Sequence, residues 1–276
     1  MQTLADGLEI TPSKELIERN VFTGTIGEVT PRTGTKSVTG SIPVEARAFS
    51  TAGSAPEFDK LMKSAMGSRR QNTTDITTKN SGNTDTILQI QDSDISKIQV
   101  GDIVLVKEAG AYHVSPVIAR STGTGTASIT LLVPHPDGAM SASVVIAKFT
   151  TYTVAESGHP TLSVTKYDDN AVEEKAMGCR VNNMSLENFS TGQIPSMSFG
   201  FDGIDFDRAL NAPSFTPSYD SALPPIVLNA RAYVDGESVD VNEVGLSLEN
   251  TVSFATAINR ANGKISSRIT KRAISG

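Results

Sequence analysis

The sequence contains no tryptophan and only one cysteine, and aromatic residues make up 5% of the chain. Because Cys179 has no second cysteine to pair with, an intramolecular disulfide is excluded. This cysteine usage is typical of a protein that folds in a reducing compartment, and 276 residues suffice to bury a core without disulfide support. We therefore expect the single thiol to be a small buried residue of a strand.

Long apolar stretches are also missing. A membrane-spanning helix needs about 18 consecutive apolar residues, whereas the strongest apolar runs here are as short as 103–106. The first residues lack the basic start and the apolar centre of a secretory signal peptide. We therefore expect a soluble protein that has no membrane partner and is made in the cytoplasm.

No group of residues predicts catalysis, a cofactor or a metal ion. The three histidines, His113, His135 and His159, are far apart in the sequence, and none has a second ligand at metal-binding spacing. Cys179 lies beside Arg180, but a catalytic thiolate also needs a histidine base, and none is near it in the sequence. The glycine-rich stretch 121–126 lacks the lysine of a phosphate-binding loop. The chain is therefore predicted not to be an enzyme.

Charge is distributed unevenly along the chain, whose net charge is −6. Residues 1–150 carry 14 basic and 15 acidic groups (net −1), residues 151–250 carry 5 and 15 (net −10), and residues 251–276 carry 5 and 0 (net +5). A net acidic chain argues against a broad basic face that grips nucleic acid. Either the two charged regions are separate solvated surfaces, or the basic end of one copy contacts the acidic region of the next, since complementary potentials set register.

The abundant residue types favour β-structure. Serine and threonine supply 59 residues and glycine 22. Threonine suits the half-buried surface of a sheet, and glycine and serine suit its turns. Strands are expected at 16–29, 37–48, 86–91, 102–107, 112–120, 128–133, 143–152, 161–167, 177–186, 194–201, 226–234, 238–248 and 251–259, with a loop over 31–36.

One helix is predicted between Ser54 and Gly67, near 55–66. Ser54 and Glu57 have the spacing of a capping box, and Gly67 is a suitable C-terminal cap. An apolar stripe with helical spacing contains Phe58, Leu61, Met62 and Ala65. This helix is expected to pack on a sheet.

The stretch 68–85 is polar, contains Arg69 and Arg70, and has almost no apolar residue to bury. It is interpreted as a long exposed loop or arm, and plain disorder is the alternative. The short strands that follow, separated by turns, predict a compact β insertion over 86–150. The predicted organisation is a β core of residues 1–85 and 151–276 that carries this insertion.

The chain ends in strand-like sequence at 264–276, which is rich in basic residues. A terminal strand leaves one edge without a partner, and such an edge can pair with a neighbouring subunit. This edge, together with the lack of catalytic groups, indicates a structural protein that associates with itself.

Five segments share a pattern with a known family. They are 17–24 (IERNVFTG), 36–47 (KSVTGSI followed by EAR), 55–61 (APEFDKL), 178–186 (GCRVNNMSL) and 192–201 (GQIPSMSFGF). They resemble the tail tube proteins of tailed bacteriophages, in particular major tail proteins of the siphophage type. The resemblance covers most of the chain apart from the insertion.

The resemblance implies a mainly β fold, a tail-tube-type β-sandwich or open barrel with one flanking α-helix and a small β insertion. It implies hexameric rings that stack into a hollow tube, which surrounds a tape-measure protein and conducts genome DNA during ejection without binding it specifically. Tail terminator and tail tip proteins would be further partners. The protein would be made in the cytoplasm of the host bacterium and would reside in the virion tail.

Two sets of residues are candidates for roles in such a tube. An acidic lumen would repel phosphates, so the acidic motif of Asp202, Asp205 and Asp207 is predicted to face the lumen. A solvated hairpin tip is the alternative for this motif. The arm and the basic end are predicted to contact adjacent subunits through Arg69, Arg70, Arg260, Lys264, Arg268, Lys271 and Arg272.

Other functions also fit the sequence. Within the structural class, the chain could form the inner tube of a contractile tail or a tail terminator. From a different class, a soluble carbohydrate-binding β module would have a similar composition, although sparse aromatic residues argue against it.

Overall fold

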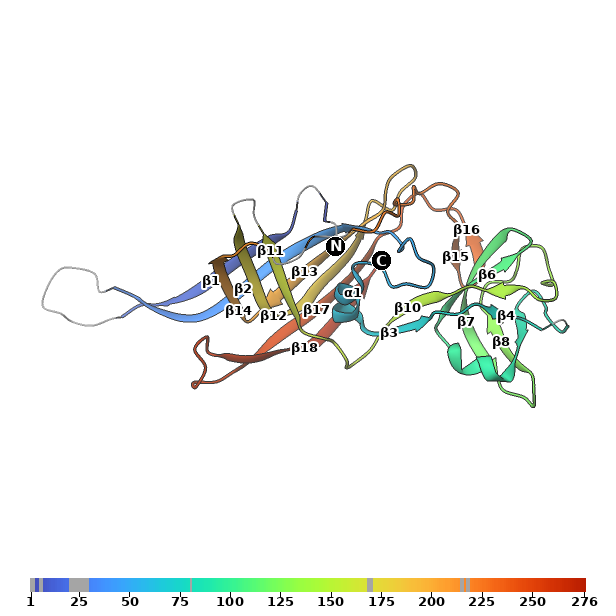
Figure 1. Ribbon diagram of the computed structural model, residues 1–276, viewed down its shortest axis with the longest axis horizontal. Coiled ribbons are helices and arrows are strands. Elements are labelled where there is room, and N and C mark those ends of the chain that lie inside the picture. The colour runs from blue at the N-terminus through green and yellow to red at the C-terminus, as the bar shows by residue number, and fades with distance from the viewer. Residues whose placement is uncertain are drawn as a thin grey trace, which may run out of the picture.

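The computed structural model describes residues 3–4, 7–19, 30–79, 81–167, 171–213, 216 and 219–276. The predicted mainly β fold is confirmed, with 52% of the described residues in strands and 6% in helices. The molecule is elongated, with a large curled sheet at one end and a smaller sheet at the other (Figure 1). Within the described residues, no helix has the length and apolarity needed to span a membrane.

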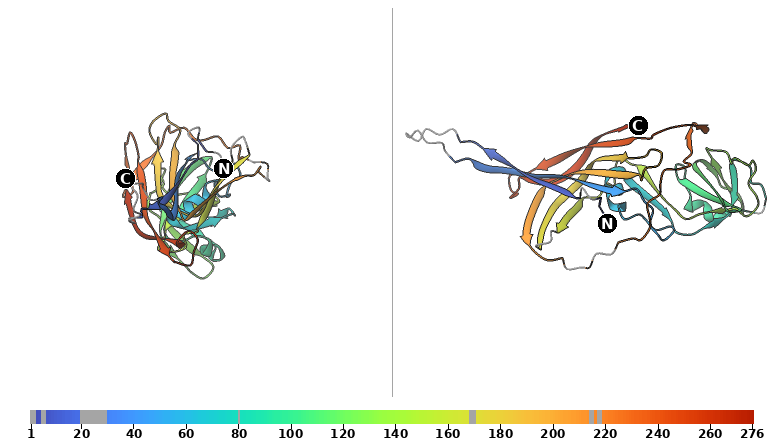
Figure 2. Two further views of the ribbon diagram at one scale, coloured as in Figure 1. Left: turned by 90° about the vertical axis from the view of Figure 1, so that its left-hand side faces the viewer. Right: turned by 90° about the horizontal axis from the view of Figure 1, so that it is seen from above.

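Within the described part of the chain, the larger sheet has eight strands and curls into a half-barrel. Six of them lie side by side, each antiparallel to its neighbours, in this order: β1 (Glu9–Ile17), β2 (Arg32–Glu45), β13 (Ser196–Gly203), β12 (Val172–Glu187), β17 (Leu246–Thr256) and β18 (Lys264–Ser275). The other two, β11 (Leu162–Tyr167) and β14 (Asp205–Leu210), pair with the first half of β12. The β1–β2 pair extends beyond the rest of the sheet (Figure 2).

The smaller sheet has six strands, in this order: β4 (Ile76–Thr77), β9 (Val145–Ile146), β6 (Ile103–Glu108), β7 (Ala111–Ser121), β8 (Ala127–Leu131) and β5 (Ile87–Ile90). A 3-10 helix, η1 (Asp92–Lys97), follows β5. The backbone N–H of Lys79 donates to the carbonyl oxygen of Gln89 at 2.7 Å, which brings the β4 and β5 ends of the sheet together.

Two elements connect the sheets. Strands β3 (Gly67–Asn72) and β10 (Phe149–Val154) form an antiparallel pair between them (Figure 1). The hairpin of β15 (Ala232–Val234) and β16 (Glu237–Val239) also reaches the smaller sheet, because a Cβ on Gly236 would lie 3.3 Å from the carbonyl oxygen of Leu132. Its tight turn uses the left-handed backbone of Asp235 (φ 52°) and Gly236 (φ 86°).

Helix α1 (Asp59–Met66) packs its buried residues Leu61, Ser64 and Ala65 on one face of the larger sheet. The core beneath it contains the fully buried Phe199 and Phe201 of β13. The other members of this buried cluster are Val38, Ile42, Val44, Val164, Ala176, Cys179, Val181, Met184 and Leu248. The core of the larger sheet therefore lies between α1 and one face of the sheet, as the apolar stripe predicts.

A separate buried cluster fills the smaller sheet. Its members are Ile76, Leu88, Ile90, Ile95, Ile98, Val104, Val106, Val117, Ala127, Ile129, Leu131, Met140, Val144, Ile146 and Phe149. The two clusters share no residue. Each sheet thus packs around its own core, and the division of the chain into two domains with the boundaries given above stays a prediction.

The predicted exposed arm over 68–85 is wrong. Residues Gly67–Asn72 form β3, paired with β10, and Ile76 and Thr77 form β4, paired with β9. Ile76 and Thr78 are buried. The prediction was based on the polar side chains of this segment, but backbone hydrogen bonds to a strand distant in the sequence hold the segment in place.

Other boundaries also differ from the expectations. The predicted loop over 31–36 lies mostly in β2, and β1 begins at Glu9, before the predicted start at 16; residues 20–29 lie outside the described residues. Helix α1 begins at Asp59 without a side-chain cap, because Glu57 instead accepts bonds from Arg47 and from the N–H of Asp220. Gly67 (φ 97°) ends the helix as predicted. Most of the predicted strand at 226–234 is irregular.

The stability of the smaller sheet is expected to fall in acid because of His113. This buried ring contacts His135 edge-on at 5.2 Å between centroids, and its Nε2 lies 2.9 Å from the carbonyl oxygen of Val133. Burial lowers the pKa of His113 from its ordinary value, and the charges of His135 and Arg231 lower it further. The unfolded chain therefore takes up a proton near pH 6.5 that the folded chain resists, so stability is lost as the pH falls from 7 to 5.

Thermal unfolding of wild type and of His113→Gln at pH 7 and pH 5 measures this effect. The glutamine can still donate to Val133 but cannot gain a charge, so the melting temperature of the variant should change less between the two pH values. An equal change in both proteins would show that His113 is not responsible.

Candidate assembly surfaces

One face of the larger sheet packs on α1, and the opposite face is polar. Side chains alternate along a strand, so Thr39, Ser41 and Pro43 of β2, which alternate with the core side, point away from the buried Val38, Ile42 and Val44. The register continues this surface, which we call the polar face, across all six strands. Its residues are Glu9, Thr11, Ser13, Ser37, Thr39, Ser41, Pro43, Glu45, Arg180, Asn183, Ser185, Glu187, Ser198, Gly200, Asp202, Ser247, Glu249, Thr251, Ser253, Ala255, Ser266, Arg268, Lys271, Ala273 and Ser275.

The polar face combines small side chains with an excess of acidic ones. One row across the strands consists of Pro43, Ser198, Ser185, Ser247 and Ser275, and no residue of the face is aromatic. Its acidic residues are Glu9, Glu45, Glu187, Asp202 and Glu249. Two of its basic residues, Arg268 and Lys271, lie on the last strand, β18, and the third, Arg180, lies opposite Asp202 and donates to the carbonyl oxygen of Ser267 at 2.7 Å. Such a surface offers neither apolar area nor a basic patch for binding another molecule.

The acidic motif is split between two parts of the sheet. Asp202 lies near the end of β13 on the polar face. Burial raises its pKa, although a hydrogen bond with Asn182 and the charge of Lys264 act in the opposite direction. Asp205 and Asp207 lie on β14, opposite Met177 and Lys175 of β12. Asp205 lies 4.0 Å from Lys36 Nζ. The three carboxylates are therefore not one solvated hairpin tip, and their predicted place in a lumen remains a prediction.

The six-strand row has an open edge at each end in the described part of the chain. Strand β1 pairs with β2 alone, and strand β18 pairs with β17 alone. The backbone groups on the far side of each edge strand can therefore accept a strand from another chain. The terminal strand expected at 264–276 is present, but it has an intramolecular partner on one side.

Three of the predicted inter-subunit residues bond within their own chain. Arg69 Nη1 lies 2.6 Å from Asp59 Oδ2, and Arg70 Nε lies 3.1 Å from the buried Asp102. Arg272 Nε donates to Asn250 Oδ1 at 2.8 Å. These contacts hold β3 and β18 to the rest of the fold.

The remaining basic candidates are nearer the surface. Lys264 Nζ lies 4.2 Å from the centre of the Phe254 ring. Arg260, Arg268 and Lys271 are exposed and form no ion pair within the described residues. Arg268 and Lys271 at the β18 edge are thus the candidates best placed to meet a neighbouring subunit.

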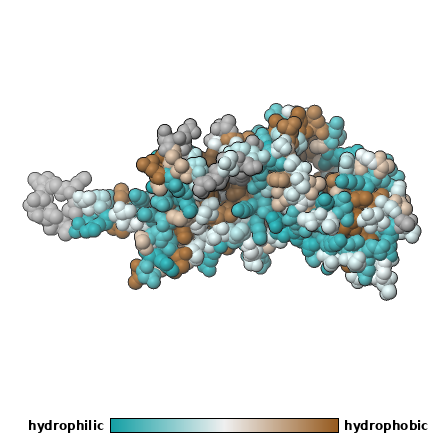
Figure 3. All heavy atoms as spheres, in the orientation of Figure 1, coloured by the Kyte–Doolittle hydropathy of each residue, from teal (hydrophilic) through white to brown (hydrophobic). Residues whose placement is uncertain are grey.

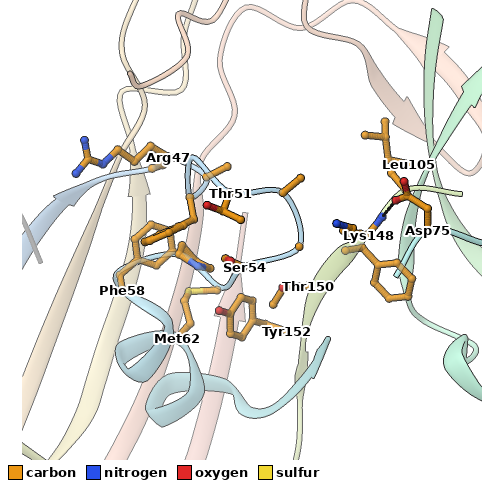
Figure 4. A pocket seen from close by; sticks show the side chains of 18 of the residues that line it. Arg47, Thr51, Ser54, Phe58, Met62, Asp75, Leu105, Lys148, Thr150 and Tyr152 are labelled. Carbon is orange, nitrogen blue, oxygen red and sulfur yellow. Dashed lines mark hydrogen bonds between the residues drawn. The ribbon is translucent and has the colours of Figure 1, made fainter. Parts of the chain in front are cut away.

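A cavity of about 580 Å³ lies where the two sheets approach each other (Figure 4). Phe58 of the loop before α1 and Met62 of α1 form one wall, and Leu105 and Lys107 of β6 form the other. The carboxylate of Asp75 accepts a hydrogen bond from the backbone N–H of Lys148 at 3.0 Å. Tyr152 donates to Asp59 Oδ1 at 2.7 Å. The polar groups of Asp75 and Tyr152 in the cavity wall therefore hold the surrounding segments in place.

The residues considered for chemistry have structural surroundings. Cys179 is fully buried, as expected, and burial raises the pKa of its thiol to about 12. His159 lies 2.9 Å from the carbonyl oxygen of Ser64 and 3.0 Å from Arg272 Nη2. No group of three or more His, Cys, Asp or Glu among the described residues is arranged to hold a metal ion.

A curled sheet with an acidic polar face and free edges defines a mainly β structural protein that acts through its surfaces. Comparison with known families matches residues 2–276 to the phage tail tube proteins. The chain belongs to this family, and it is a structural component of the virion tail. Comparison with curated proteins gives no significant match.

Sequence reasoning missed the polar face. Its members are spread over six strands, and Glu187 and Glu249 were not among the acidic candidates although they lie on the same face as Asp202. Alternation of small polar residues with apolar ones in β2 and β13 was the available signal. The pairing of these strands was needed to join them into one surface.

The open β1 edge depends on Gly40. A Cβ at this position would overlap the carbonyl oxygen of Glu9 and lie 2.5 Å from Phe201 Cζ. Gly40→Ala should therefore loosen β1 and lower the free energy of unfolding by about 3 kcal/mol, as overpacking of a core does. Chemical denaturation measures the change.

Gly34→Ala is the matched control in the same strand. A Cβ there would lie 3.1 Å from Glu15 Oε2 and from Ile17 Cδ1, which are the ends of flexible side chains. Its unfolding free energy should stay close to that of wild type. Equal losses in the two variants would contradict the role assigned to Gly40.

Proposed function

We propose that copies of this chain form hexameric rings that stack into a hollow tail tube, with the polar face lining the lumen. The polar face supports this proposal, because an antiparallel sheet commonly packs one face on the core and exposes the other to solvent. This face is free of aromatic and long aliphatic side chains, so it suits the passage of another polymer. The protein acts without catalysing a reaction.

The passing polymer in this proposal is genome DNA. DNA binds proteins mainly through basic groups that neutralise phosphates. The acidic residues of the polar face repel phosphates. Of its three basic residues, Arg268 and Lys271 lie at the β18 edge, and Arg180 lies opposite Asp202 and bonds to Ser267. DNA would therefore slide without being held. Before ejection the same lumen would surround a tape-measure protein, and tail terminator and tail tip proteins would meet the two ends of the tube.

In this arrangement the β18 edge of one copy pairs with the β1 edge of its neighbour. Joining open edges satisfies backbone groups that otherwise face solvent. It also places the basic Arg268 and Lys271 beside the acidic Glu9 of the next copy, which favours this orientation. Synthesis in the host cytoplasm fits a chain whose single cysteine is buried and reduced.

Cysteine cross-linking tests the edge contact. Opposite residues on one face of paired strands have Cβ atoms about 5 Å apart, within reach of a disulfide. Pairs that combine Thr11→Cys or Ser13→Cys with Ala273→Cys or Ser275→Cys share the polar face. At least one pair should give ladders of covalent multimers after oxidation of assembled protein, and electron microscopy should show hollow tubes.

Each single-cysteine variant is the control, because the buried Cys179 does not react. These variants should give no multimer beyond a dimer. A protein that stays monomeric on concentration would overturn the proposed function. Regular tubes in which no cysteine pair forms ladders would overturn the edge contact alone.

The charge of the lumen is tested by neutralising Asp202, Asp205 and Asp207 together to Asn. Particles built with this variant should form tubes of normal length but release DNA about twofold or more slowly, because repulsion of phosphates is reduced. Release of DNA from purified particles measures the rate.

A matched control makes the same charge change on the smaller sheet, at the exposed Asp85, Asp92 and Asp137. Its DNA release should equal that of wild type. Unaltered release with the first variant would remove Asp202, Asp205 and Asp207 from the lumen.

A further inference from the structure

An apolar surface lies on the side of β6 and β7 that faces away from the core of the smaller sheet. Register places Ile103 opposite Pro116 and Leu105 opposite Val114. Ile103 is 51% exposed, Val114 52% and Tyr112 64%. We call this area the outer β6–β7 surface, formed by Ile103, Leu105, Tyr112, Val114, Pro116 and Ile118. Both faces of this strand pair are therefore apolar, but only one is buried in a core.

The outer β6–β7 surface continues into the cavity between the sheets. Leu105 belongs to both and lies on the β6 side of the cavity in Figure 4, and Lys107, which follows it on the same face of β6, also lines the cavity. Hydrophobic side chains are visible over β6 and β7 at the right of Figure 3. An apolar strip that ends in a hollow is a shape that receives a protruding apolar segment.

A second apolar area lies on the larger sheet, around the turn between β12 and β13. Backbone bonds from Gly192 to Val227 (2.9 Å) and from Val244 to Phe189 (3.0 Å) gather three segments there. We call it the turn surface, formed by Ile194, Leu223, Ile226, Leu228, Val241, Val244 and Leu246, which are between 37% and 89% exposed. Hydrophobic side chains are gathered at the top of Figure 3 over these loops.

The charges beside the two areas are opposite in sign. The acidic Asp240 and Glu243 are next to Val241 and Val244 of the turn surface in the sequence, whereas Asp235 and Glu237 belong to the β15–β16 hairpin, which lies at the smaller sheet. The basic Lys107 and Lys148 lie beside the outer β6–β7 surface, and the acidic residue there, Asp75, accepts a backbone N–H. Complementary potentials of this kind favour one pairing of surfaces and disfavour others.

We propose that the outer β6–β7 surface of one copy binds the turn surface of a neighbouring copy. Two unlike surfaces on one chain form a heterologous contact, which propagates along an assembly instead of closing as a dimer. This contact is separate from the β1–β18 edge contact, and it rests on the proposed function because it assumes that copies are stacked. The smaller sheet is then an assembly element that covers apolar area of its neighbour.

Opposite charges introduced at one exposed position test this contact. Both Val114→Glu and Val114→Lys remove apolar contact, but only the glutamate also meets the acidic turn surface. We expect Val114→Glu to raise the protein concentration required for tube formation about tenfold and Val114→Lys to raise it about threefold. On the turn surface the preference should reverse, because Leu228 would face the basic Lys107 and Lys148. Leu228→Lys should therefore impair assembly more than Leu228→Glu.

Tube formation is followed by electron microscopy, and self-association of each variant by sedimentation velocity. Thr124→Glu, on an exposed loop of the smaller sheet, is the control and should assemble like wild type. Equal thermal unfolding of dilute variants shows that the surface changes leave the fold intact.

Normal assembly of all four variants would overturn the contact. This holds even if the variants lose binding to a carbohydrate or to another tail protein, because the surface would then bind that partner and not a second copy. The same order at both positions would also overturn it, because the pairing requires opposite preferences. If wild type forms no tubes, the proposed function is wrong. The contact can still be tested in that case, by comparing self-association of wild type and variants in sedimentation.

Discussion

The larger sheet depends on the way in which β12 pairs with four strands. Its first half lies between β11 and β14, and its second half lies between β13 and β17. The change occurs at Gly178, whose left-handed backbone (φ 63°) and missing side chain admit Ile204, since a Cβ would lie 2.5 Å from Ile204 Cγ1. The resulting bend lets one long strand belong to both parts of a curled sheet.

The pairing of β12 also determines where α1 packs. Beyond the pair of Asn183 and Glu249, strands β12 and β17 have no further register partners, and the helix fills the gap. Asn250 Nδ2 donates to the carbonyl oxygens of Ala65 (3.1 Å) and Val181 (3.2 Å), which satisfies groups that a neighbouring strand would otherwise bond. Arg272 bonds to the same Asn250, so a charge that looks suited to a subunit contact instead holds β18 in place.

Local patterns were sufficient to predict most strands, the helix and the mainly β class. Val38, Ile42 and Val44 of the strand predicted over 37–48 are buried, and the stripe of α1 packs on the sheet. The arm over 68–85 could not be predicted correctly, because β3 is held by backbone bonds to β10 and the pairing of Asn72 with Phe149 is not visible in its polar side chains. The helix start failed for a related reason, since Glu57 bonds to Arg47 and to Asp220, far away in the sequence.

The sequence alone determined the β class, the exclusion of disulfide support, the burial of Cys179 and the resemblance to tail tube proteins, which the match over 2–276 confirms. These follow from composition and from patterns within one strand or helix. The tertiary structure decided which acidic residues share a face, which arginines have internal partners and which strands are edges. Each of these depends on register between strands that are distant in the chain, and register is set by packing of the whole sheet.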